Sequence, residues 1–143
     1  MNNRTVAIAR VLFLFGIYAG LRSFWFTLSY TWNPEFAAVN FPGGETHSNY
    51  HAFRGALMAL AVNLLLIRAA IKGSSISNEA WNITLFMAIF YYAGWWLAWP
   101  IWGYHAPVIM ADITHLIGTV GGLAGLALIR PKHNTNVAYQ EGT

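Results

Sequence analysis

Apolar residues along this chain are gathered into long blocks that short polar links separate. Four mostly apolar runs cover residues 5–30, 49–71, 78–102 and 107–130. Each run exceeds the roughly 20 residues that an α-helix needs to cross the apolar core of a bilayer. The pattern therefore predicts an all-α protein with a single membrane domain over residues 1–143. In this domain four helices form an antiparallel bundle that runs up-down-up-down.

Turn and cap residues mark the ends of these runs. Pro34 follows the first run and disfavours helix in the residue before it, and Ser77 is placed to cap the start of the third helix. Pro100 is expected to kink or end the third helix, whereas Pro107 suits the first turn of the fourth. The polar tail over residues 131–143 is expected to be flexible.

The composition strengthens the membrane interpretation. Hydrophobic residues make up 57% of the chain and charged residues only 9%, which is too apolar for a soluble domain. The absence of cysteine excludes disulfides, thiolate metal ligands and cysteine nucleophiles. The formal charge of +3 does not indicate nucleic-acid binding, because the basic residues flank the apolar runs instead of clustering on one face. The first run shows no good cleavage site, so we expect an uncleaved span.

Lysine and arginine are distributed unevenly over the links. With four spans, both termini and the middle link share one side, and the two links on the other side contain neither residue type. Basic residues favour the cytoplasmic side. We therefore expect both termini in the cytoplasm of a multi-pass protein, in a bacterial inner membrane. The basic residues on this side are Arg4, Arg10, Arg68, Lys72, Arg130 and Lys132.

Ionisable residues inside the runs fall in the opposite, outer half of the membrane. A charge at this depth costs at least about 2.5 kcal/mol, so it usually has a partner. We expect Asp112 to be ionised and paired with Arg22 or Arg54. His51 and His115 are expected to lie within reach of the same pocket.

The direction of these groups follows from glycines on the fourth run. Asp112 and His115 continue into Gly118, Gly122 and Gly125 along one helical stripe. Glycines permit close helix packing, so this stripe is expected to face the bundle. The same three glycines are an alternative surface for a homo-oligomer or a protein partner. A similar stripe on the first run consists of Tyr18, Arg22, Trp25 and Ser29.

Several kinds of chemistry remain open for the outer half. His115 or Asp112 is a candidate general base, with Arg54 to hold an anion. The alternative is a structural arginine–aspartate pair that locks two helices. Candidate ligand-binding residues are Arg22 and His51, together with Trp95 and Trp99 from the aromatic end of the third run, whose other interpretation is an interfacial aromatic belt.

Metal ligation is a further alternative. His47 with His51, and Asp112 with His115, are same-face pairs whose imidazole and carboxylate groups suit zinc, copper or iron. Haem b between His51 and His115 is another alternative, because the two lie on different runs at similar depth. Neither pair matches a specific signature, and the sequence predicts no cofactor.

Part of the chain resembles a known family. The four short runs, and Asn49 followed five residues later by Arg54 and Gly55, resemble an uncharacterised bacterial family of small four-span membrane proteins that is distantly DoxX-like. The resemblance implies a four-helix bundle and assigns no activity. Two hypotheses remain: an accessory subunit or a bundle that binds a small hydrophobic ligand, and a membrane enzyme that uses His, Asp and Arg on a lipid-soluble substrate.

Overall fold

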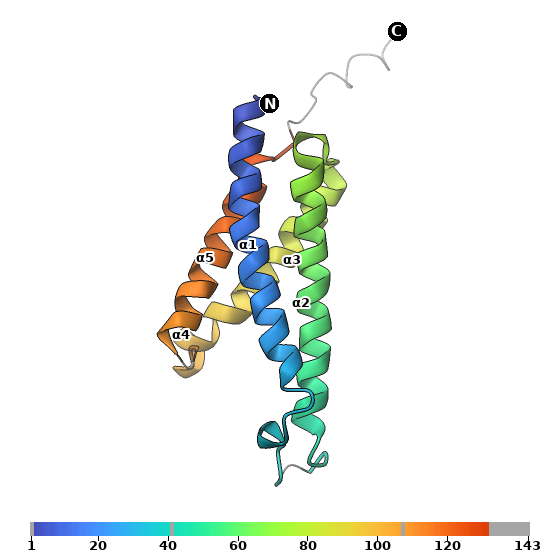
Figure 1. The fold of residues 1–143 in the computed structure, drawn as a ribbon, viewed down its shortest axis with the longest axis vertical. Helices are drawn as coiled ribbons and strands as arrows, with labels where there is room; N and C mark the ends of the chain where they lie inside the picture. Colours follow the sequence, from blue (N-terminus) through green and yellow to red (C-terminus); the bar gives the residue numbers. More distant parts are fainter. Residues whose placement is uncertain (1, 41, 107, 132–143) are drawn as a thin grey trace.

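The computed structural model describes residues 2–40, 42–106 and 108–131, and within these ranges every regular element is helical (Figure 1). Four helices of at least 19 residues correspond to the four predicted runs; three agree within two positions at each end, whereas the third begins at Asn78 as expected but ends at Trp96 and not at residue 102. Pro107, and the tail beyond residue 131, lie outside the described residues. The helices are α1 (Asn3–Ser29), α2 (His47–Lys72), α3 (Asn78–Trp96), the short α4 (Ala98–Trp102) and α5 (Ile109–Leu128), with 3-10 turns at Pro34–Phe36 and Gly73–Ser75.

The third predicted run is divided into two helices. α3 begins where expected, because the Ser77 side chain accepts a hydrogen bond from the backbone of Ala80. It ends at Trp96, and the five-residue α4 follows after Leu97. The cause is Pro100, which has no N–H to donate to the carbonyl four residues earlier, that of Trp96.

The long helices run alternately in opposite directions, as predicted. Figure 1 shows the start of α1, the link from α2 to α3 and the end of α5 at one end of the molecule, which we call the closed end. The link between α1 and α2, together with α4, lies toward the other end, the open end. α1 packs against both α2 and α5, and α3 packs against the same two helices.

Most of the apolar core lies near the closed end. There the indole of Trp81 donates a hydrogen bond to the carbonyl of Leu126, at 2.9 Å, which joins α3 to α5. The guanidinium of Arg10 donates to the carbonyls of Ala70 and Ile71, so α1 satisfies carbonyls that the end of α2 leaves unpaired. Large or aliphatic side chains that are buried here include Phe13, Leu66, Trp81, Leu126 and Ile129.

The glycine face of α5 is buried, as predicted. A Cβ atom added at Gly122 would lie 2.0 Å from the hydroxyl of Tyr92, and one added at Gly16 would lie 2.8 Å from the backbone nitrogen of Gly122. A Cβ added at Gly118 would lie 2.8 Å from Ala19. This face is therefore occupied by α1 and α3 of the same chain, and an oligomer through it stays a prediction.

The stripe predicted on the first run is largely exposed and is not the face on which α1 packs closely. Tyr18 is 63% exposed and Trp25 is 60% exposed. The face of α1 that packs inward instead has small residues around one large one, because small side chains let α5 and α2 approach closely. The buried residues of α1 are Ala9, Phe13, Gly16, Ala19 and Gly20.

Among the residues that the structure describes, three helical segments are long and apolar enough to cross a membrane, which indicates a membrane protein. They are Asn3–Ser29, His47–Ser75 and Ile109–Leu128. α3 is not among them. Its 19 residues include Asn78 and Glu79 at the start and several tyrosines and tryptophans near the end, all of which lower the mean hydropathy.

Candidate ligand-binding pocket

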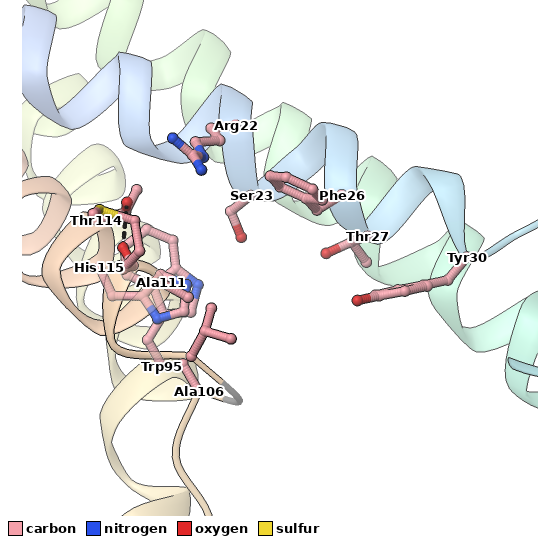
Figure 2. A pocket seen from close by; sticks show the side chains of 12 residues that line it. Arg22, Ser23, Phe26, Thr27, Tyr30, Trp95, Ala106, Ala111, Thr114 and His115 are labelled. Carbon is pink, nitrogen blue, oxygen red and sulfur yellow. Dashed lines mark hydrogen bonds between the residues drawn. The ribbon is translucent and has the colours of Figure 1, made fainter.

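A pocket of about 420 Å³ lies between the second half of α1 and the beginning of α5, toward the open end. It exists because the buried faces of these two helices stop at Gly20 on α1 and begin only at Gly118 on α5. Figure 2 shows α1 along one wall, with α5, Trp95 and the loop at Ala106 opposite. The pocket is lined by Arg22, Ser23, Phe26, Thr27, Tyr30, Trp95, Ala106, Val108, Met110, Ala111, Thr114 and His115.

The α1 wall carries most of the polar atoms. Ser23, Thr27 and Tyr30 follow one another at helical spacing, and their side chains point from α1 into the pocket in Figure 2. Arg22 lies beside them, with its guanidinium carbon 5.5 Å from the centre of the Phe26 ring. A positive charge and three hydroxyl groups therefore line one side of a mainly apolar hollow.

Arg22 has no carboxylate partner among the described residues. Within residues 2–40, 42–106 and 108–131, the single ion pair closer than 4.0 Å joins His105 to Asp112. None of the described residues that line the pocket is an aspartate or a glutamate. In the part of the chain that the structure describes, the charge of Arg22 is therefore compensated only by the face of the Phe26 ring.

The opposite wall is ordered by aromatic stacking. The imidazole of His115 lies parallel to the indole of Trp95, with ring centres 4.3 Å apart and an interplanar angle of 17°. Next to this stack, the indole of Trp96 donates a hydrogen bond to the Thr119 hydroxyl, which in turn donates to the carbonyl of His115. These contacts fix the end of α3 against α5 and hold the imidazole at the pocket wall.

The predicted ion pair between Asp112 and an arginine is wrong. The Asp112 carboxylate instead accepts hydrogen bonds from Nδ1 of His105, at 3.0 Å, and from the backbone N–H of Ala106, at 3.3 Å. The link before α5 folds back over the first turn of the helix, which brings these donors closer than either arginine. The side chain of His105 is exposed, yet it supplies the partner of Asp112.

The other candidate residues are separated from this pocket. His47 and His51 lie in another hollow, between the end of α1, the following loop and the start of α2, and their Nε2 atoms are 2.8 Å apart. Arg54 is exposed on α2, with its guanidinium carbon 5.6 Å from the centre of the Tyr50 ring. Trp99 is exposed on α4, and its ring centre is 6.1 Å from that of His105.

The structure thus brings together Arg22, Trp95 and His115 from the predicted set. The four candidate metal ligands do not form one site: in the described ranges no group of three or more His, Cys, Asp or Glu residues converges. The sequence interpretation missed Ser23, Thr27 and Tyr30. These hydroxyl side chains begin at the position after Arg22 and are spaced by four and then three residues, as on one face of a helix. That spacing could have identified them, because the run around them contains few other polar groups.

Neither protein-family models, nor curated proteins, nor solved structures give a match to this chain. The resemblance to the four-span, distantly DoxX-like family therefore stays a prediction. The function of the protein has to be inferred from the geometry of the pocket alone.

Proposed function

We propose that this protein is a four-span membrane bundle that binds a small lipid-soluble molecule with an anionic group in the pocket between α1, α3 and α5. As the fourth span, α3 would extend about 28 Å at 1.5 Å per residue, close to the ~30 Å of a bilayer core. Its outward side chains Ile83, Phe86 and Phe90 are exposed and apolar, which suits contact with lipid. The basic residues near the closed end favour a cytoplasmic location for both termini.

The observation that carries this proposal is Arg22. An arginine inside a membrane helix costs at least about 2.5 kcal/mol unless it is paired or hydrated, so it usually marks a functional site. Arg22 lines a pocket and lacks a carboxylate within ion-pair distance in the described chain. The anionic group of a ligand would supply the missing charge, and Ser23 and Thr27 would donate further hydrogen bonds to it.

Binding explains the pocket better than acid–base catalysis does. A general base is usually oriented by a second group, and Asp112 is the carboxylate nearest to His115 in sequence on α5. That carboxylate is already held by His105 and the backbone of Ala106. A membrane enzyme remains the second candidate, because His115 and Arg22 line the same pocket and would both contact a bound substrate.

The decisive test compares two arginine variants. Arg22→Gln removes the charge at the pocket, and Arg54→Gln is its matched control, because Arg54 is also exposed and stacks on an aromatic ring but does not line the pocket. Palmitate binding would be measured in mild detergent by native mass spectrometry and by the shift in unfolding temperature. We expect Arg22→Gln to weaken binding at least about tenfold, since a hydrogen bond to a charged group contributes roughly 1.5–3 kcal/mol. Arg54→Gln should bind like the parent protein, and equal losses in both variants would contradict the proposal.

A further inference from the structure

A second hollow lies beside the pocket, in the groove between α1 and α5. Its volume is about 450 Å³, and it is lined by apolar side chains of α1 between Val11 and Ala19 and by Thr114 and Ile117 of α5. The hydroxyl of Thr114 donates to the carbonyl of Met110, so it presents little unsatisfied polarity to this groove. We call this hollow the α1/α5 groove.

The groove and the pocket are neighbours on the same two helices. Thr114 lines both of them. On α1, the lining residues Tyr18 and Ala19 are followed one turn later by Arg22 and Ser23, which line the pocket. The two hollows therefore adjoin at Thr114, and we call them together the track; its polar lining residues lie on the side of Arg22.

We propose that the track holds a single amphiphile, with its anionic headgroup at Arg22 and its apolar chain along the α1/α5 groove. This inference rests on the proposed function and specifies the ligand class: a carboxylate or phosphate lipid with a long acyl or isoprenoid chain. The residues from Val11 to Ala19 rise about 12 Å along α1, which is enough to align a substantial part of such a chain.

The direction of the track matches that of a lipid in one leaflet. Arg22 is seven residues from the end of α1 at Ser29, or about 10 Å along the helix, toward the open end. The groove runs from there toward the middle of the bundle. A lipid of the leaflet at the open end has the same orientation, with its headgroup outward and its chain inward, so it can enter from the side without turning over.

Chain length alone is a poor test of this inference. A lipid chain in a bilayer is already in an apolar surrounding, so moving it into the groove yields packing contacts and little hydrophobic gain. The position of the chain on the protein is the informative quantity, and photolabelling measures it directly.

The experiment uses the full chain in phosphatidylcholine vesicles and two photoreactive fatty acids. One has its diazirine beside the carboxylate, and the other has it half-way along the chain. We expect the first to label the pocket at Ser23 and Thr27, and the second to label α1 over residues 11–19. Palmitate or hexadecyl phosphate should compete with both labels, and whichever competes more strongly identifies the headgroup; hexadecanol should compete with neither. Arg22→Gln should lower both labels roughly tenfold, as the loss of a charged hydrogen bond predicts.

A pair of leucine variants tests the groove separately. Leu14 lines the groove and is 66% exposed, whereas Leu64 on α2 is 56% exposed and outside it. Leu14→Trp should displace the mid-chain label from α1, and Leu64→Trp should leave it unchanged, with both variants checked for unfolding temperature. One outcome would overturn this inference and leave the proposed function standing: palmitate or hexadecyl phosphate reduces the label in the pocket, but the mid-chain label is spread over all lipid-facing helices. If neither palmitate nor hexadecyl phosphate reduced either label, both this inference and the proposed function would be overturned.

Discussion

The closed and open ends of this bundle differ in how α1 meets α5. Near the closed end the two helices approach so closely that a Cβ added at Gly121 would lie 2.6 Å from the carbonyl oxygen of Leu12. Toward the open end, larger side chains such as Arg22 and Phe26 occupy α1, and a pocket of about 420 Å³ separates the helices. Figure 1 shows α4 and the beginning of α5 diverging from the later part of α1. The pocket is therefore the space left where close helix packing ends.

This difference separates two kinds of residue on the same helices. Side chains near the closed end are needed for packing, because backbone contact between helices tolerates no added atoms. Side chains at the open end leave a hollow whose polar groups are only partly satisfied within the described chain. We therefore expect substitutions near the closed end to change stability, and substitutions at the pocket to change binding more than stability.

The largest effect should come from breaking the close packing between α1, α3 and α5. Gly122→Leu would place atoms where the Tyr92 side chain lies, at 2.0 Å from its hydroxyl. Overpacking of this kind costs about 1–3 kcal/mol and occasionally more, and we expect the upper part of that range because the backbone of Gly16 also lies close. The measurement is thermal unfolding in detergent.

The control for this variant is Gly94→Leu on α3. A Cβ added at Gly94 has no heavy atom within 4 Å. Its unfolding temperature should therefore stay within a few degrees of that of the parent protein. If both leucine variants unfolded at the same temperature, the close packing between α1, α3 and α5 at Gly122 would not be what stabilises the bundle.

A smaller loss of stability is expected from His115→Ala at the pocket. The variant removes the stack of the imidazole on Trp95, and aromatic stacking contributes about 0.5–1.5 kcal/mol beyond buried area. Palmitate binding should weaken less than in Arg22→Gln, because the headgroup charge is still compensated. If the protein is instead an enzyme, His115→Ala should abolish turnover of its lipid substrate and leave the fold nearly intact, which would separate the two functions.

The smallest effect should come from Asp112→Asn. Its partner His105 has a side chain that is 57% exposed, and such pairs typically contribute about 0–1 kcal/mol. We expect a change in unfolding free energy near the lower end of that range, because an asparagine side-chain oxygen can still accept a hydrogen bond from Ala106. A loss as large as that of Gly122→Leu would mean that the carboxylate neutralises a buried charge, as the pairing with an arginine would require.

The sequence by itself determined the helices and one packing face. Long apolar runs, Ser77 as a cap and Pro100 as a helix breaker are local features, so the helix ends follow from backbone hydrogen bonding and need no tertiary contact. The glycines of α5 were also informative, because three of them on one stripe favour close contact with another helix whichever helix it is. The high proportion of apolar residues also indicated the many exposed apolar side chains that the structure has.

Only the tertiary structure decided the partners of the charged groups. The membrane depth predicted from the sequence placed Asp112 at a level similar to that of Arg22. Depth is only one coordinate, and the partner of a charged group also depends on the rotation of its helix about the axis and on the path of the connecting loop. The connecting loop brings His105 within hydrogen-bond distance of Asp112, and Arg22 lines a pocket instead. The face of α1 was likewise decided by packing: the small residues Gly16, Ala19 and Gly20 turned inward, because only they allow α5 and α2 to approach.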